Sequence, residues 1–177
     1  MNNIEAELRS FITKEQYDKL LDFFNKNAEL TKRDYQESRY FDCEEDLRIQ
    51  QSKKYAKLWL KKGRVHDEAR EEIEIKVDRK DFDKLEDLLN GIGLNVEIKW
   101  FRDRHQFDWK GVKVCIDYTK GYGHILELEK LCSEAEKEKC LEELRERFKE
   151  LEIEVTPREH FEKKYAHYRK NWKELTK

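Results

Sequence analysis

Apolar and polar side chains alternate along several segments of this chain, as expected for β-strands with one buried face and one polar face. The pattern begins at Ile4, and it places Glu5, Glu7 and Arg9 on the same side of the first segment. The segment 70–77 repeats it, with charged residues at the even positions and apolar residues at 73, 75 and 77. The pattern predicts strands near residues 3–11, 36–42, 46–51, 55–62, 69–77, 95–108, 111–118 and 123–130, and a short one at 151–155.

Four other segments follow the helical period of 3.6 residues, with an apolar stripe on one side. Thr13 and Gln16 form a capping box before the first, which carries Tyr17, Leu20 and Phe24. The second carries Phe82 and Leu89 and ends near Gly91, the third starts after Ser133 and Glu136, and the fourth starts at Thr156, Pro157 and Glu159. The sequence therefore predicts an α+β fold.

The apolar stripes of these helices have to be buried, and the apolar side of the sheet is the surface available to them. If the sheet closes with the helices outside, its polar faces turn inward and line a tunnel. The pattern thus predicts a closed antiparallel β-barrel with helices packed outside, or an open α+β sheet with one wet face. At 177 residues, one domain spanning residues 1–177 is expected.

Composition narrows the classes of function. Charged residues make up 44% of the chain, but the net charge is only −2, so we expect no nucleic-acid partner and no membrane partner. No apolar run approaches the ~20 residues of a membrane helix. The sequence starts directly in a strand pattern, and its four cysteines show no CxxC spacing. Reduced thiols and a cytoplasmic location are the expectation.

Charged residues on the strand faces suggest a binding site. Glu5 and Glu7 form one carboxylate pair and Glu127 and Glu129 another, with Asp117 shortly before the second pair. Clustered carboxylates suit Mg²⁺ or Mn²⁺. Basic residues that could bind phosphate follow the same alternation: Arg48, Arg70, Arg102, Arg104 and Lys113. The alternative is an ordinary solvated face with cross-strand ion pairs. Lys61 and Lys62 point to opposite faces, and alternation leaves open which one points inward.

Other chemistries have less support in the sequence. The five histidines are scattered without the spacing of a zinc site. No GxSxG motif and no cysteine–histidine motif suggests a covalent nucleophile. We interpret Trp59, Trp100, Trp109 and Trp172 as packing residues rather than a platform for stacked bases. The charged strand faces therefore remain the leading candidate for a functional site.

The order of these motifs resembles the CYTH domains, the triphosphate tunnel metalloenzymes. Residues 5–9 resemble the ExExK signature of that family, and residues 117–129 resemble its DxxxGLGxxxEIE block. Further segments resemble its other motifs: Tyr40-Phe41-Asp42, Leu47-Arg48-Ile49, Lys62-Gly63, Arg70-Glu71-Glu72 and Arg102-Asp103-Arg104. Arg9 replaces the usual lysine, Gln50 stands where a second arginine is common, Arg64 replaces a proline, and Tyr122 interrupts the glycine turn.

The resemblance implies a closed antiparallel tunnel and a set of roles inside it. Mg²⁺ or Mn²⁺ would be held by Glu5, Glu7, Glu72, Glu127 and Glu129. Phosphates would be bound by Arg9, Arg48, Lys62, Arg70, Arg102 and Arg104, with Asp117 and Lys62 as catalytic residues. Asp117 would orient the metal or a phosphate-bound base.

The function implied by this resemblance is a metal-dependent triphosphate phosphohydrolase. Its substrate would be tripolyphosphate, thiamine triphosphate or ATP, and the protein would be a monomer or a homodimer. Two alternatives remain open: a class IV-type adenylyl cyclase that makes cyclic AMP and pyrophosphate, and a non-catalytic module that binds polyphosphate or nucleotide.

Overall fold

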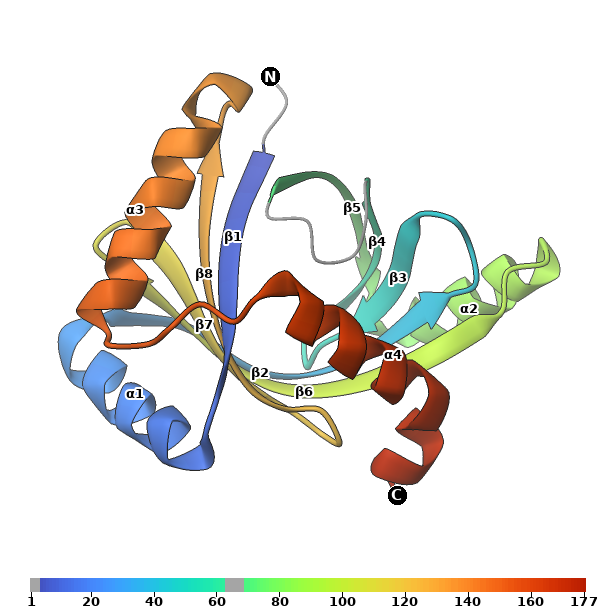
Figure 1. Ribbon diagram of the computed structural model, residues 1–177. Helices are drawn as coiled ribbons and strands as arrows, with labels where there is room; N and C mark the ends of the chain where they lie inside the picture. The colour runs from blue at the N-terminus through green and yellow to red at the C-terminus, as the bar shows by residue number, and fades with distance from the viewer. Residues whose placement is uncertain (1–3, 63–68) are drawn as a thin grey trace.

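The structure, a computed structural model, describes residues 4–62 and 69–177, apart from the side chains of residues 69 and 70. Eight strands form one antiparallel sheet (Figure 1), and they are β1 (Ile4–Ile12), β2 (Glu29–Phe41), β3 (Asp46–Gln51), β4 (Tyr55–Lys61), β5 (Ala69–Asp78), β6 (Val96–Trp109), β7 (Val112–Thr119) and β8 (Gly123–Cys132). The α-helices are α1 (Lys14–Asn27), α2 (Phe82–Gly91), α3 (Lys137–Glu150) and α4 (Arg158–Leu175).

The sheet closes on itself. Its strand order is β1-β5-β4-β3-β2-β6-β7-β8, and β1 pairs with both β8 and β5. The β1–β8 ladder runs the full length of β1, whereas the β1–β5 ladder runs only from Ile4↔Glu71 to Ala6↔Ala69. The closed antiparallel barrel with outer helices is therefore confirmed, and the open sheet is excluded.

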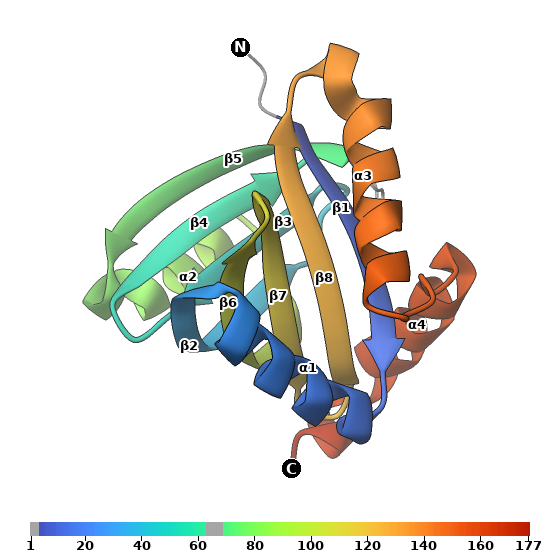
Figure 2. The same cartoon turned by 90° about the vertical axis from the view of Figure 1, so that its left-hand side faces the viewer.

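Helices α1 and α3 cover the outer face of β1, β7 and β8 (Figure 2). Alternation along these strands directs Leu8, Val114 and Leu128 outward, where they contact Phe24 of α1 and Leu144 of α3. All five side chains are almost completely buried, and each such burial stabilises the fold by about 1.5–3 kcal/mol. The polar side chains of the same strands are thereby directed to the interior.

The first and third helices begin as the sequence predicts. Thr13 accepts a hydrogen bond from the backbone of Gln16, and the Gln16 side chain accepts one from the backbone of Thr13. Ser133 and Glu136 form the second capping box, on a short 3₁₀ turn that leads into α3. Thr156 precedes α4, and its hydroxyl also accepts a hydrogen bond from the Phe11 backbone at 3.0 Å. This contact ties the start of α4 to the end of β1.

Three expectations about the elements are corrected. Strand β2 begins at Glu29, seven residues before the predicted start, because its first half carries few apolar residues to mark it. Residues 151–155 form no strand, since Glu152 has a φ of 56° and breaks the extended backbone. The apolar side of β5 is not covered by a helix: Ile73 and Ile75 are 46% and 57% exposed.

The last helix closes an aromatic cluster. Phe161 and Tyr168 of α4 pack with Tyr40, Trp100 and Tyr122 from the sheet, and Tyr168 donates a hydrogen bond to the Lys99 carbonyl of β6 at 2.9 Å. Among the described residues, no helix is both long and apolar enough to cross a membrane.

Candidate functional site in the tunnel

The interior of the ring is a charged tunnel. A cavity of about 180 Å³ lies inside it, and its lining comes from the inward-facing residues of all eight strands. These residues are Glu5, Glu7, Arg9, Lys32, Gln36, Arg48, Gln50, Tyr55, Lys57, Trp59, Lys61, Glu72, Glu74, Arg102, Arg104, Gln106, Lys113, Glu127 and Glu129. Strand alternation explains why acids and bases from distant parts of the chain meet there.

One wall carries two arginines on β6, held by a buried carboxylate on β7. Arg102 donates to Asp117 at 3.0 Å, and Arg104 donates to both of its oxygens at 2.6–3.1 Å. Asp117 is only 1% exposed, and the two arginines hold its pKa below the ordinary value although burial alone would raise it. With both oxygens occupied, Asp117 fixes the arginines and does not itself line the main cavity.

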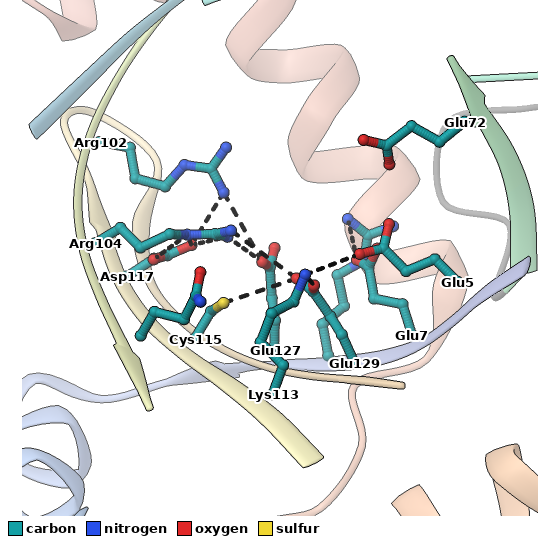
Figure 3. Close-up of polar contacts among 12 residues, drawn as sticks. Glu5, Glu7, Glu72, Arg102, Arg104, Lys113, Cys115, Asp117, Glu127 and Glu129 are labelled. Atoms are coloured by element: carbon teal, nitrogen blue, oxygen red, sulfur yellow. Dashed lines mark hydrogen bonds and ion pairs between the residues drawn. The ribbon is translucent and has the colours of Figure 1, made fainter. Parts of the chain in front are cut away.

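Glu5, Glu7 and Glu72 lie across the tunnel from these two arginines, and the other two glutamates lie between the two groups (Figure 3). Glu127 and Glu129 project from β8 beside Arg104, and Glu127 pairs with it directly. Glu5 and Glu7 project from the neighbouring β1, and Glu5 accepts hydrogen bonds from Lys61 and Lys113, each at 3.0 Å. Glu127 and Glu5 are thus each paired with a base, as buried charges require.

Two of these carboxyls titrate as a pair. Burial and the nearby Glu5 carboxylate raise the pKa of Glu129 to about 8. Burial would also raise the pKa of Glu5, but the Lys61 and Lys113 ammonium groups outweigh it and hold that pKa below its ordinary value. Near neutral pH, Glu129 therefore keeps a proton while Glu5 is ionised. Crowded carboxyls of this kind gain from a cation that replaces the proton.

Arg48 forms a second cationic centre, on β3. Its guanidinium donates to Asp46 at 2.6 Å and stacks near the Tyr40 and Trp59 rings, with its carbon 4.4 Å and 4.8 Å from their centroids. Alternation did not single out Asp46, and Trp59, interpreted from the sequence as a packing residue, lines the tunnel beside Arg48. Their spacing of two residues from Arg48 and Lys61, respectively, was the available signal.

The structure places Lys61, and not Lys62, in the tunnel. Lys61 donates to Glu5 and lies 3.4 Å from Glu72, whereas the Lys62 side chain is 52% exposed and pairs with Glu71 outside. The expectation of Lys62 as an interior residue is therefore corrected. The apolar residues Ala56 and Leu58 share the alternation of Lys62, which is why it faces outward.

The other expected residues fall into three groups. Those that line the main cavity are Glu5, Glu7, Arg9, Arg48, Glu72, Arg102, Arg104, Glu127 and Glu129. Asp117 lies behind the arginines and borders a second cavity. The side chain of Arg70 lies outside the described part of the chain, although its backbone pairs with Glu5.

The second cavity lies toward α4. It measures about 50 Å³, and Tyr40, Trp100 and Tyr122 line it together with Phe161 and Tyr165 of α4. At ~10–15 Å³ of such space for each water, it has room for a few water molecules. Arg48, Arg102 and Glu127 border both cavities, so the second cavity continues the tunnel toward α4. Because it is the smaller of the two, at about 50 Å³ against 180 Å³, the α4 end of the tunnel is its narrow end.

The donor set fits a divalent metal ion. Cys115, Glu127 and Glu129 offer ligand atoms within 4.8 Å of one another, and all three residues are buried. Glu5 and Glu7 add carboxylates from the neighbouring strand. Oxygen donors of this kind are what Mg²⁺ and Mn²⁺ prefer. The Cys115 thiol donates toward Glu129 at 3.7 Å, and the resemblance gave no reason to expect a cysteine here.

The comparisons agree with this architecture. The sequence matches the CYTH domain family over residues 3–165, so the chain belongs to the CYTH family. Proteins of this family are generally metal-dependent and bind triphosphate substrates. No curated protein matches the sequence.

Solved structures share the fold. The PH1819 protein of Pyrococcus horikoshii is 26% identical, with a TM-score of 0.72 over 87% of this chain and 93% of that one. A candidate adenylate cyclase of Vibrio parahaemolyticus is 16% identical, with a TM-score of 0.69 over 86% and 91%. The candidate adenylyl cyclase HpAC1 of Hippeastrum, which shows a dominant triphosphatase activity, is 20% identical, with a TM-score of 0.62 over 85% and 88%.

Proposed function

We propose that this protein hydrolyses a linear triphosphate bound in the tunnel as a complex with Mg²⁺ or Mn²⁺. The observation that carries the proposal is that acids and bases line one tunnel together, with Arg102 and Arg104 on one side of Glu127 and Glu129 and with Glu5, Glu7 and Glu72 on the other (Figure 3). The bases Arg9, Arg48, Lys61, Arg102 and Arg104 match a chain of phosphates. The acids Glu5, Glu7, Glu127 and Glu129, with Glu72 further along, match the cation that accompanies it.

The residues contribute chiefly by positioning and by electrostatics. Arg102 and Arg104 bind non-bridging oxygens, and Asp117 keeps both guanidinium groups aimed at them. Lys61 takes the role first assigned to Lys62, and it balances charge that develops on the leaving phosphate. The metal, when bound, polarises the phosphoryl group. Attack of water on the terminal phosphorus then breaks the anhydride bond and releases orthophosphate.

The narrow end of the tunnel favours hydrolysis over cyclisation. A cyclase must also seat the adenine and direct the ribose hydroxyl at the α-phosphorus. The cavity of about 50 Å³ beside α4 is too small for a purine while Phe161 and Tyr165 occupy that end. ATP therefore enters, if at all, with its phosphates first and its base outside. The candidate cyclases among the structural neighbours make cyclic AMP the product to test against.

Product analysis decides between the reactions. The purified protein is incubated with tripolyphosphate, with thiamine triphosphate and with ATP, each with Mg²⁺, with Mn²⁺ and with excess EDTA. We expect orthophosphate that depends on the metal. Cyclic AMP with pyrophosphate as the main product would establish the cyclase instead. Binding without any product would establish the non-catalytic module.

A double variant tests the acidic residues. Glu127→Gln with Glu129→Gln keeps the side-chain volume but removes the charge that a hard cation requires. We expect a folded protein in which kcat falls by at least about 100-fold, the scale of losing one electrostatic contact to the transition state. Circular dichroism confirms folding. Activity equal to the wild type with both metals would exclude these residues as ligands.

A further inference from the structure

Three buried polar groups without a protein partner meet at the second cavity. They are the Thr119 hydroxyl, the Tyr122 hydroxyl and the Nε–H of Arg102, and no group in the described part of the chain forms a hydrogen bond with any of them. All three residues line the cavity of about 50 Å³ beside α4. Buried polar groups are almost always hydrogen-bonded, so three unpaired groups around one cavity indicate that a small polar molecule binds there.

Strand pairing and the turn from β7 to β8 bring these groups together. Arg102 of β6 and Thr119 of β7 are directly opposite residues of one ladder, so their side chains lie on the same face of the sheet. Tyr122 follows in the turn, where its amide donates to the Thr119 carbonyl at 3.0 Å. Arg102, Thr119 and Tyr122 are only 7%, 0% and 3% exposed, so bulk solvent does not satisfy them.

Aromatic contacts fix the ring of Tyr122 at the border of the cavity. Its centroid lies 4.5 Å from that of Trp100, 5.4 Å from that of Phe11 and 5.5 Å from that of Tyr168. Burial raises the pKa of Tyr122 above its ordinary value, so its hydroxyl keeps its proton and can both donate and accept a hydrogen bond. Tyr122 also replaces the leucine of the family's glycine turn, so this hydroxyl is a departure of the chain from the family motif.

Size and charge identify water as the molecule that fits. The cavity has room for a few water molecules at ~10–15 Å³ each. Its lining carries charges of both signs, from Arg9, Arg48, Arg102, Asp117 and Glu127. An isolated anion or cation would meet like charges there, whereas water donates to carboxylates and accepts from guanidinium groups.

We propose that this cavity holds the water that attacks the terminal phosphate, and that Tyr122 and Thr119 position it. The inference rests on the proposed function, and it adds the source of the water and the direction of the substrate. Arg102 borders both cavities, so a phosphate that it binds in the tunnel lies next to this water. The triphosphate therefore lies with its reacting end toward α4.

Water held in this way is oriented for attack. A hydroxyl of Tyr122 or Thr119 that accepts one proton of the water leaves a lone pair of the water oxygen free to face the phosphorus. As the new P–O bond forms, the bridging P–O bond breaks, and its electron pair stays with the departing diphosphate. Both protons of the water end on the orthophosphate, one on the attacking oxygen and one on a non-bridging oxygen. Positioning of this kind lowers the barrier because the reacting atoms already meet in a productive geometry.

Removal of each hydroxyl tests the inference. Tyr122→Phe and Thr119→Val are compared with Tyr168→Phe, because the Tyr168 hydroxyl also lies in the aromatic cluster but bonds the Lys99 carbonyl and lines neither cavity. For each of the first two variants we expect kcat to fall roughly tenfold, the scale of one hydrogen bond made in the transition state. KM and calorimetric binding of tripolyphosphate with Mg²⁺ should stay within about twofold of wild type. The control should keep its kcat, and Thr119→Ser, which retains the hydroxyl, should recover most of the loss.

A second readout does not depend on activity. If Tyr122 bonds water, Tyr122→Phe removes that hydrogen bond and lowers the Tm, as we expect. If the cavity is dry, the same change removes a buried unpaired hydroxyl and raises the Tm. A crystal structure of the wild type at high resolution should show water within hydrogen-bond distance of Tyr122, Thr119 and Arg102. A raised Tm, or no water at these groups, would overturn the inference.

The outcomes separate this inference from the proposed function. Unchanged kcat in both Tyr122→Phe and Thr119→Val, in a protein that releases orthophosphate, would overturn the inference and leave the hydrolase standing. A parallel loss of binding and turnover would also overturn it, since the hydroxyls would then hold the substrate rather than the water. A wild type that binds tripolyphosphate but releases no orthophosphate would refute the hydrolase and this inference together.

Discussion

Lys61 and Lys62 are neighbours in the sequence, but the strand directs them to opposite sides of the barrel wall. Lys61 lies between Glu5 and Glu72 inside the tunnel, and Lys62 lies with Glu71 on the outer surface. The two side chains have the same chemistry and differ only in their surroundings. Each is therefore the natural control for the other.

We expect Lys61→Ala to weaken binding of tripolyphosphate by about 1.5–3 kcal/mol, the value of a hydrogen bond to a charged group. Lys62→Ala should change binding by less than about 0.5 kcal/mol, as exposed pairs contribute little. Calorimetric titration of both variants with Mg²⁺ measures the difference. Equal effects, or a larger loss in the Lys62 variant, would contradict the placement of the site.

Glu129 gives stability a definite dependence on pH. The folded carboxyl keeps its proton up to about pH 8, whereas an unfolded glutamate loses it near about 4.3. Between these values the native state binds more protons, so the contribution of Glu129 to the free energy of unfolding falls as pH rises. Glu5, whose pKa is lowered, loses its contribution only at more acidic pH.

The measurement is the difference in unfolding free energy between wild type and Glu129→Gln without metal, from pH 5 to pH 8.5. Taking the difference removes the contribution of His105 and His124, whose lowered pKa values act in the opposite direction. We expect the wild type to lose stability relative to the variant as pH rises. A flat difference would show that Glu129 is ionised throughout.

At the level of side chains, the sequence predicted the tunnel residues well wherever a strand alternated cleanly. Glu5, Glu7, Arg102, Glu127 and Glu129 all face inward for this reason. Asp46 and Cys115 were missed because a single buried acid or thiol has no distinctive pattern. Asp46 matters through its contact with Arg48 on the same strand, and Cys115 through its contact with Glu129 on the neighbouring strand β8.

Among the elements, the turn from β7 to β8 depends on glycine. Gly121 has a φ of 73°, and a Cβ added there would lie 2.6 Å from the Cβ of Leu175, near the end of α4. Gly111, in the turn from β6 to β7, has the same φ of 73° but no atom within 4 Å of an added Cβ. The two positions share backbone strain and differ in the contact with α4.

We expect Gly111→Ala to destabilise the protein by about 1 kcal/mol from strain in the left-handed region. Gly121→Ala should cost at least about 1–3 kcal/mol more, the scale of overpacking, because the end of α4 must shift. Urea unfolding of both variants gives the two values. Equal destabilisation would show that α4 does not press on this turn.

The elements that the sequence misjudged share a physical cause. The first half of β2 is polar on both faces, yet the ladder with β6 from Glu29↔Asp108 onward makes it a strand. Residues 151–155 alternate like a strand but find no partner strand, and the Ser10 hydroxyl bonds the Glu154 carbonyl instead. In both cases, whether the segment forms a strand depends on pairing with a distant segment. The periodicity within one segment does not reveal that pairing.

At the level of the whole molecule, closure of the ring concentrates charges of both signs in one cavity. The sequence alone left closure open, because the same alternation suits an open sheet with a solvated face. The β1–β5 seam decides it, and that seam is only a few residues long. Resemblance to the CYTH motifs therefore carried information about closure that alternation lacked.

The mixed lining predicts that metal and triphosphate stabilise the protein cooperatively. Metal alone must separate acids such as Glu5 and Glu129 from Lys61 and Lys113, and triphosphate alone must draw the arginines away from Glu127. When both ligands are bound, the metal pairs with the acids and the triphosphate pairs with the bases, so both sets of charges are neutralised. At about 100 times its Kd the complex should add ~2.7 kcal/mol, which raises the Tm by roughly 5–11 °C for a domain of this size. Thermal unfolding with Mg²⁺, with tripolyphosphate and with both measures this, and a combined shift no larger than the two separate shifts together would refute the cooperative site.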